Sequence, residues 1–302
     1  MEISRADLAD FAYFLAIARN RSFRRAAQAL GVTTSALSHA MTALEARRGV
    51  RLLNRTTRSV TLTAAGEELL ARIAGPLEAI GEASENLNRY RDAPAGRVRI
   101  SVPEDAAALL LNPVMPTFIE RYPDVEVDIS VSNRLIDVIG SGFDAGIRYG
   151  GTVPEDMIAQ RLSADIRWVA AAAPSYLKRF GAPKTPDDLQ RHRCIRIRLG
   201  NGQLYQWEFD KGDDSIAVVA PGPLTVDASQ AALGLGLRGC GIIYGSEPVF
   251  RPHFASGVLQ PVLNDWATTG EGFHIYYSGR RQVPTGLRLL VELIREMRPL
   301  GL

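Results

Sequence analysis

The stretch from Ser22 to Leu44 constrains the fold of this chain more than any other, because it holds two short amphipathic segments with only Gly31-Val32 between them. Their apolar residues recur at spacings of three and four, which is typical of helices: Phe23, Ala26, Ala27 and Leu30, then Ala36, Leu37, Ala40, Met41 and Leu44. Ser22 is the expected N-cap of the first helix and Gly31 its expected end. A connection this short predicts two helices that cross at a steep angle.

The second segment leaves a polar and nearly uncharged face opposite its apolar stripe, made of Thr34, Ser35, Ser38, His39 and Thr42. Short polar side chains in the first half of a helix can enter a DNA major groove and reach base edges. The amino end of the helix also favours a nearby phosphate. The alternative is an ordinary two-helix hairpin with a solvated face, and the pattern favours DNA binding over it.

The flanking residues complete a small basic domain. A first helix is predicted over residues 5–18, with Leu8, Phe11, Phe14, Leu15 and Ala18 on its core side. Arg47-Arg48-Gly49 is expected to end the third helix, since cations suit a last turn and glycine a C-cap. Residues 51–62 predict a hairpin, or wing, with Arg55 and Arg58 near its turn, where they suit phosphate or a narrow minor groove.

The charge of the chain is unevenly distributed. Residues 1–62 carry ten Arg and four acidic residues, a formal charge of +6, whereas the whole chain of 302 residues carries +2. The remainder therefore carries −4. A basic N-terminal segment, here called the head (residues 1–62), followed by an acidic remainder suggests that only the head binds a polyanionic partner.

A long helix is predicted from Ala64 to about Tyr90, with Thr63 as its cap. Its apolar residues follow heptad-like spacing: Leu69, Ile73, Leu77, Ile80 and Leu87. A second copy of the same helix is the simplest partner for this stripe. The alternative is that the helix packs onto its own chain. Residues 92–96 then form a hinge.

From Arg97 onward, predicted strands alternate with predicted helices, which indicates a parallel-sheet α/β architecture. The strands are expected at 98–102, 125–131, 144–149, 166–173, 241–244 and 273–277, and the helices at 106–121, 174–180, 228–237 and 284–298. About 200 residues of this kind suit two lobes with a cleft between them, where ligands bind beyond strand ends and near helix N-termini.

Several other classes of protein are disfavoured. No apolar run is long enough for a membrane span, and early acidic residues such as Glu2 are not typical of a signal peptide. Two lone cysteines predict neither a disulfide framework nor a metal site. A cytoplasmic protein is therefore expected. The glycines between Gly234 and Gly239 match a dinucleotide fingerprint, but a helix precedes them and a strand follows, the reverse of the required order. Cys194 near His192 lacks the third group of a nucleophilic site. We expect no enzymatic activity, cofactor or metal.

The residues between Phe14 and Gly66 resemble the DNA-binding domain of LysR-type transcriptional regulators. The matching residues are Phe23, Ala26-Ala27, Leu30, Val32, Ser35, Leu37-Ser38, Leu44-Glu45, Gly49-Val50, Leu52, Arg55, Leu62-Thr63 and Ala65-Gly66. The later segments GRVRIS, RYPDVEV, GFDAGIR, APSYL and PDDLQRHRCI are similar to the effector domain of the same family. The resemblance therefore covers essentially the whole chain.

This resemblance implies an α+β multidomain protein. A winged helix-turn-helix domain (1–62) is followed by a dimerisation linker helix (63–91), a hinge (92–96) and a two-lobed α/β effector-binding domain (97–302) of the type 2 periplasmic-binding-protein-like fold. Lobe I would combine 97–163 with 268–302, and lobe II would be 164–267. The implied partners are double-stranded promoter DNA, a small-molecule effector and further copies of the chain, as a homodimer or homotetramer, with no membrane.

The resemblance also assigns site residues. DNA contacts would fall on Thr33, Thr34, Ser35, Ser38, His39, Thr42, Arg55 and Arg58. The effector would lie against Ser101, Pro103, Glu104, Asp105, Arg148, Tyr149, Gly150, Asp227, Ala228 and Ser229. Relatives often have Ser-Gln at 33–34 and Gln or Arg at Ala40, so the operator sequence does not carry over.

Glu104 and Asp105 stand where a helix begins, at a position where many relatives present hydroxyls. Acids in a first turn stabilise the helix dipole and need no ligand. A sharper hypothesis is that they occupy the anion site themselves, or face a neutral or cationic effector. The leading function is effector-responsive transcription regulation. The runner-up is an α/β binding protein or enzyme with an incidental helical head.

Overall fold

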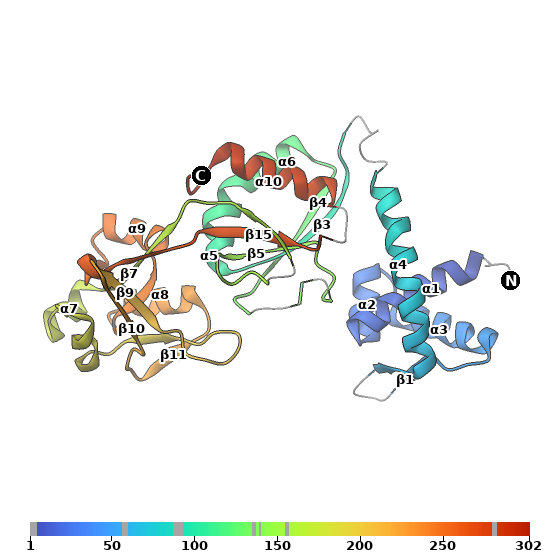
Figure 1. Cartoon of the computed structure of the whole chain (residues 1–302), viewed down its shortest axis with the longest axis horizontal. Helices are drawn as coiled ribbons and strands as arrows, with labels where there is room; N and C mark the ends of the chain where they lie inside the picture. Colours follow the sequence, from blue (N-terminus) through green and yellow to red (C-terminus); the bar gives the residue numbers. More distant parts are fainter. Residues whose placement is uncertain are drawn as a thin grey trace. The chain divides into compact units, whose positions relative to one another are not determined.

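The computed structural model describes residues 5–55, 60–86, 93–134, 137–138, 140–154, 157–279 and 283–302. Contacts divide the chain into an N-terminal unit, chiefly residues 1–93, and a C-terminal unit of residues 94–138 and 143–302. Figure 1 shows the first as helical and the second as mixed helix and sheet. Among the described residues, no helix is long and apolar enough to cross a membrane.

The N-terminal unit is a three-helix bundle with a short hairpin and a long helix. Its elements are α1 (Arg5–Asn20), α2 (Phe23–Leu30), α3 (Thr34–Arg48), β1 (Leu53–Arg55), β2 (Val60–Leu62) and α4 (Ala64–Asn86). Ser22 caps α2, and Gly31 and Gly49 end α2 and α3 in the left-handed conformation, all as predicted. Strands β1 and β2 pair antiparallel, which confirms the hairpin. The Thr63 hydroxyl accepts from the amide of Gly66 at 3.0 Å and so caps α4.

The core of this unit differs from the predicted apolar faces at three positions. Leu8 is 47% exposed, Leu30 is 37% exposed and Ala36 is exposed, so these three predictions were wrong. The buried side of α1 is made of Asp7, Asp10, Phe14, Leu15 and Ile17. The spacing of apolar residues could not predict this face, because two of its members are aspartates. Asp7 and Asp10 can be buried only because arginines pair with them.

In its described residues, the C-terminal unit contains two larger sheets and two two-stranded ones, and the first larger sheet has the order β4-β3-β5-β15-β6. Its strands are β3 (Gly96–Val102), β4 (Val125–Val131), β5 (Ala145–Tyr149), β6 (Ile158–Arg161) and β15 (Phe273–Tyr277). Helices α6 (Asn112–Arg121) and α10 (Thr285–Met297) pack with these strands around one apolar core. The helix predicted at 106–121 consists of α5 (Glu104–Ala106), a π-helical turn (Ala107–Leu111) and α6.

The second sheet is built on β7 (Ile166–Ala172), which pairs antiparallel with three later strands: β12 (Ile243–Ser246), β13 (Gln260–Val262) and β14 (Thr268–Gly270). Around it lie β8 (Ile195–Ile197) paired with β11 (Leu224–Val226), the hairpin of β9 (Trp207–Lys211) and β10 (Asp214–Val218), and helices α7 (Pro174–Phe180), α8 (Ser229–Leu237) and α9 (Glu247–Ala255). Short 3-10 helices lie at Pro186–Arg191 and Asn264–Trp266.

The expected parallel architecture was only partly right. Strand β3 runs parallel to β4 and β5, but β15 is antiparallel to its neighbours and so is every partner of β7. The chain passes from the first sheet to the second after β6 and returns after β14. By its hydrogen bonds, β14 belongs with the second sheet, although residue 268 was expected to begin the return to lobe I.

Candidate functional site

The polar face of α3 is presented as the sequence predicted. Thr34, Ser35, His39 and Thr42 are exposed and Ser38 is half-buried, while Leu37, Met41 and Leu44 on the other side are fully buried. Thr33 is the N-cap, and its hydroxyl accepts from the amide of Ala36 at 3.1 Å. The hydroxyl of Thr42 donates to the carbonyl of Ser38 at 2.9 Å. The face is therefore a set of short polar groups on a well-capped helix.

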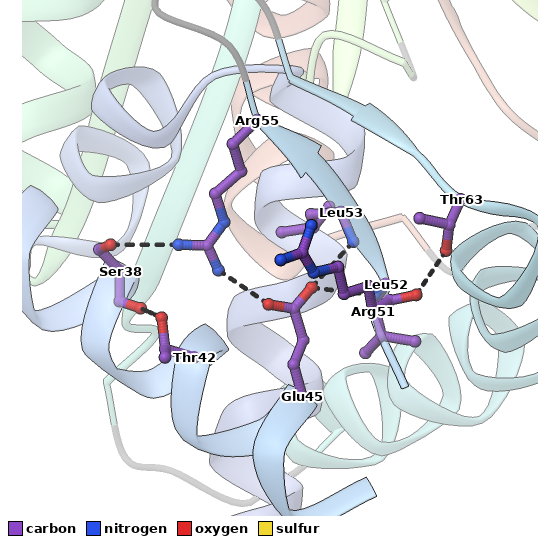
Figure 2. Close-up of polar contacts among 8 residues, drawn as sticks. All are labelled: Ser38, Thr42, Glu45, Arg51, Leu52, Leu53, Arg55 and Thr63. Carbon is purple, nitrogen blue, oxygen red and sulfur yellow. Dashed lines mark hydrogen bonds and ion pairs between the residues drawn. The ribbon is translucent and has the colours of Figure 1, made fainter. Parts of the chain in front are cut away.

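Arg55 lies on β1, and its guanidinium is folded back onto α3 (Figure 2). Nη1 donates to the Ser38 hydroxyl at 3.2 Å, and Nη2 pairs with Glu45 Oε2 at 3.2 Å. The same guanidinium lies 4.8 Å from the centre of the Phe23 ring. Arg55 thus joins the wing to the helix pair, and about 30% of its side chain is left exposed. Arg58, the other predicted wing contact, lies outside the described residues.

Glu45 has a role in this unit that sequence reasoning missed. Its Oε1 accepts from the amides of Leu52 and Leu53 at 2.9 and 3.0 Å, and its Oε2 holds Arg55 (Figure 2). One carboxylate therefore fixes the start of the wing relative to α3. The sequence signal that could have indicated this role is the single acidic residue on a helix whose other charged residues are basic.

The positive charge of the N-terminal unit is partly neutralised from within. Arg47 pairs with Asp7 and Asp10, and Arg48 pairs with Asp7. The pKa of Arg47 is raised, and the hydrogen bond that its guanidinium donates to Asp10 is the largest cause. These pairs offset part of the charge of Arg47 and Arg48, and the exposed arginines of the unit also include Arg21, Arg24, Arg25 and Arg51. A shallow hollow of about 710 Å³, lined in part by Arg51, opens between the end of α3 and β1.

The apolar stripe of α4 divides between two environments. Leu69 and Ile73 pack against the core of their own unit, and the Glu78 carboxylate pairs with Arg19 of α1. Leu77 is half-buried, and Ile80 is 60% exposed. Leu87 lies outside the described residues. The early part of the stripe thus packs onto its own chain, and Ile80 is left to face solvent or a partner.

The predicted effector residues of β3 and β5 are less accessible than expected. Ser101 is fully buried and 96% of the surface of Arg148 is buried. The Arg148 guanidinium donates to the carbonyl and hydroxyl of Ser101 at 3.0 and 3.2 Å and to the carbonyl of Arg134 at 3.0 Å. Burial lowers the pKa of Arg148. Pro103 N-caps α5, and Gly150 lies against Glu271, where a Cβ would be 2.0 Å from a carboxylate oxygen.

The remaining predicted effector residues meet across the two lobes. Glu104 Oε2 accepts from the Ser229 hydroxyl at 2.8 Å and from the amide of Gln230 at 3.0 Å. Asp105 accepts from the Tyr149 hydroxyl at 2.7 Å, and its Oδ1 also lies 2.8 Å from the Ser229 oxygen, so the two carboxylates share the one Ser229 proton. Burial and the Asp105 carboxylate raise the pKa of Tyr149, so this hydroxyl remains a donor.

The neighbouring groups extend this network. Asn133, which sequence reasoning missed, accepts from the amide of Glu104 at 3.1 Å and donates to the carbonyl of Asp227 at 3.3 Å. Ser246, also missed, donates to Asp105 at 3.4 Å. Ala228 is the N-cap of α8 and provides no side-chain acceptor. The missed residues lie 28 and 141 positions from Asp105 in the chain, and no local pattern connects them.

The glycines at 234–239 and the pair of Cys194 and His192, which the sequence did not favour as functional sites, have surroundings consistent with structural roles. Gly234 and Gly236 lie in the second half of helix α8, Gly239 follows its end, and β12 comes next, so the order is the reverse of a dinucleotide site. Burial raises the pKa of the Cys194 thiol to about 12, which keeps it protonated, and His192 Nδ1 lies 3.2 Å from the Tyr176 hydroxyl. Within the described part of the chain, no group of three or more His, Cys, Asp or Glu side chains could hold a metal ion.

Comparisons with known proteins cover both units. Residues 8–67 match a family model described as bacterial regulatory helix-turn-helix protein, lysR family, and residues 91–299 match the LysR substrate binding domain. A Pseudomonas aeruginosa protein named as a transcriptional regulator is 39% identical over 98% of this chain and 97% of its own length. The Escherichia coli regulator YcaN is 36% identical over 96% and 95%. The structure of CrgA, a LysR-type transcriptional regulator from Neisseria meningitidis, is 28% identical with a TM-score of 0.61, over 96% and 98% of the two chains.

Proposed function

This chain belongs to the LysR family of bacterial transcriptional regulators, with a DNA-binding and an effector-binding domain, and we propose that it reads promoter DNA through the exposed face of α3. The observation that carries this proposal is the set of short hydroxyl and imidazole groups on that face: Thr34, Ser35, Ser38, His39 and Thr42. They offer donors and acceptors that can be matched to base edges, and the hydroxyls carry no charge that would bind phosphate at any sequence.

Arg55 and the exposed arginines of the unit supply the complementary, sequence-independent attraction. A guanidinium held beside the recognition helix can contact a phosphate without losing much side-chain freedom on binding, because the protein has already ordered it. Arg58 is proposed to act from the wing in the same way. Phosphate contacts fix the position of α3 on the duplex, and the polar face then distinguishes bases.

We propose that two copies bind together through α4. Ile80 presents an exposed apolar side chain on the stripe that begins with Leu69, and pairing with a second copy would cover it. A dimer delivers two recognition helices to successive half-sites, so the operator should be a near-palindrome with a spacing of about one helical turn or a multiple of it. Promoter DNA lies in the bacterial cytoplasm, and this is where the protein is proposed to act.

We further propose that a small molecule bound between the lobes of the C-terminal unit changes DNA binding. The cleft residues come from β3, β5 and the start of α8, and a ligand that binds one arrangement of the lobes better than another shifts the population towards it. The arrangement of DNA-bound subunits then changes with the ligand.

The test is binding of the full-length protein to a duplex from upstream of its own gene, followed by fluorescence anisotropy against a scrambled duplex. The double substitution Ser35→Ala and His39→Ala should reduce the preference for the upstream duplex by about tenfold or more, since each base contact contributes about 1–3 kcal/mol of discrimination. Binding to the scrambled duplex should stay nearly unchanged. Thr61→Ala, an exposed hydroxyl on β2, is the matched control. Equal affinity of the wild-type protein for both duplexes at every salt concentration would contradict the proposal.

A further inference from the structure

Helix α8 begins at the cleft without a cap from its own lobe. Ala228 stands at the N-cap, where Ser, Thr, Asp or Asn would normally accept from a first-turn amide. The first amides of a helix have no partner within the helix, and together with the helix dipole they favour an anion. The amino end of α8 therefore needs an acceptor from elsewhere.

Glu104 supplies that acceptor from the other lobe. Its carboxylate oxygen Oε2 accepts from the amide of Gln230 at 3.0 Å and from the hydroxyl of Ser229 at 2.8 Å, across 125 residues of chain. These are the donors that a carboxylate ligand would use at this helix end. Stabilisation of the dipole of its own helix does not account for Glu104, since its side chain reaches the amino end of α8.

The residues around Glu104 hold it in this position. The amide of Glu104 donates to Asn133 Oδ1 at 3.1 Å, and the same Asn133 amide group donates to the carbonyl of Asp227 at 3.3 Å. Asp105, which is only 8% exposed, shares the Ser229 proton of the second lobe with Glu104 and accepts from Tyr149 of the first. The turn that carries Glu104 is thus tied to the second lobe by backbone, amide and carboxylate contacts.

We propose that Glu104 is an internal anionic ligand of the effector cleft, which holds the lobes together and excludes carboxylate effectors from the amino end of α8. This inference rests on the proposed function, because it describes how the same cleft is regulated and which ligands it takes. An effector of the wild-type protein must either displace Glu104 from α8 or bind beside it through neutral or cationic groups. Glu104 is then the residue that determines specificity.

The test is hydrogen–deuterium exchange of the full-length protein, read at the Gln230 amide by mass spectrometry with fragmentation to single residues. In the wild-type protein this amide should be protected. Glu104→Ala should accelerate its exchange about tenfold or more, as expected when a hydrogen bond to a charged acceptor is removed. Asp213→Ala removes an exposed carboxylate from the turn between β9 and β10, and this control should leave the exchange unchanged.

Succinate is the ligand probe. It should restore protection at Gln230 in Glu104→Ala and have no effect on the wild-type protein. Glu104→Gln keeps the size of the side chain but removes its charge, so it serves even if the alanine variant does not fold. Its Gln230 amide should exchange faster than in the wild-type protein, because a neutral acceptor binds a helix amino end more weakly, and succinate should restore the protection. Unchanged exchange in both variants, or equal protection of wild type and variants by succinate, would overturn the proposal. Binding to promoter DNA is measured on the same samples, so a wild-type protein without specific DNA binding would refute the proposed function instead.

Discussion

At the scale of single residues, the acidic residues of the DNA-binding unit have structural roles that could not be inferred from the net charge of the unit. Asp7 and Asp10 are buried beneath Arg47 and Arg48, and Glu45 joins α3 to the wing. From the sequence, these residues counted only as partial compensation for an excess of arginine. The arginines that pair with Asp7 and Asp10 are 37 to 41 positions away along the chain, so local sequence patterns could not predict these pairs.

Glu45 should matter for the stability of the wing as well as for DNA binding. Glu45→Ala leaves two amides and the Arg55 guanidinium without their acceptor, and the amides belong to Leu52 and Leu53, which are each 3% exposed. We expect a loss of about 2 kcal/mol in the stability of the N-terminal unit, because unsatisfied buried donors cost about 1–3 kcal/mol. Differential scanning calorimetry of the full chain measures this as a lower transition temperature for that unit.

The control for Glu45→Ala is Glu68→Ala. Glu68 pairs with Arg72 one turn along α4, and its side chain is 70% exposed. An exposed pair of this kind contributes at most about 0.5 kcal/mol, so the transition should hardly move. Similar shifts of the transition temperature in the two variants would show that the contacts of Glu45 with the wing stabilise the unit no more than an exposed ion pair does.

At the scale of elements, local signals predicted where helices begin and end better than which faces they bury. The cap residues Ser22, Gly31 and Gly49 act over one turn, and all three are found as expected. Leu8 and Leu30 have helical spacing but are exposed, since burial depends on what packs against each helix. The antiparallel course of β15 could not be predicted either, because strand direction is decided by a return crossing far along the chain.

Helix α4 leads to a prediction about assembly. Ile80→Glu places a charge on a side chain that is 60% exposed within one subunit, so the folding of the subunit should be unaffected. If this position lies in the contact between two copies, burying the carboxylate would be costly and the dimer should dissociate at least tenfold more readily. Sedimentation equilibrium measures the association. Ala71→Glu adds the same charge to an exposed position on the opposite side of α4 and should leave association as it is.

At the scale of the whole molecule, the division of charge predicts how DNA binding responds to salt. The head of the chain is basic and the remainder acidic, so counterion release on DNA binding should come from the head alone. The sequence could predict this division, but not which arginines remain exposed. It also raised, without deciding, the possibility that Glu104 and Asp105 occupy the anion site. The contact of Glu104 with the amino end of α8 could not be predicted, because it joins residues from two lobes.

Arg51 tests the charge argument. It is exposed beside the hollow between α3 and β1 and belongs to no ion pair among the described residues. Arg51→Ala should weaken binding to the upstream and scrambled duplexes by the same factor. It should also reduce the slope of log affinity against log salt by about 1 for each phosphate that the variant no longer neutralises. Arg72→Ala, on α4, is the control. A change confined to the upstream duplex would assign Arg51 to base recognition instead.

The tie between Glu45 and the first residues of the wing has a mechanical consequence. Recognition helix and wing share one acceptor, so each DNA-reading head is stiff, and deforming it would break several hydrogen bonds at once. A small molecule bound in the other unit therefore has little means of reshaping a single head. Under the proposed function, an effector would therefore regulate transcription by altering the distance or angle between two intact DNA-binding units.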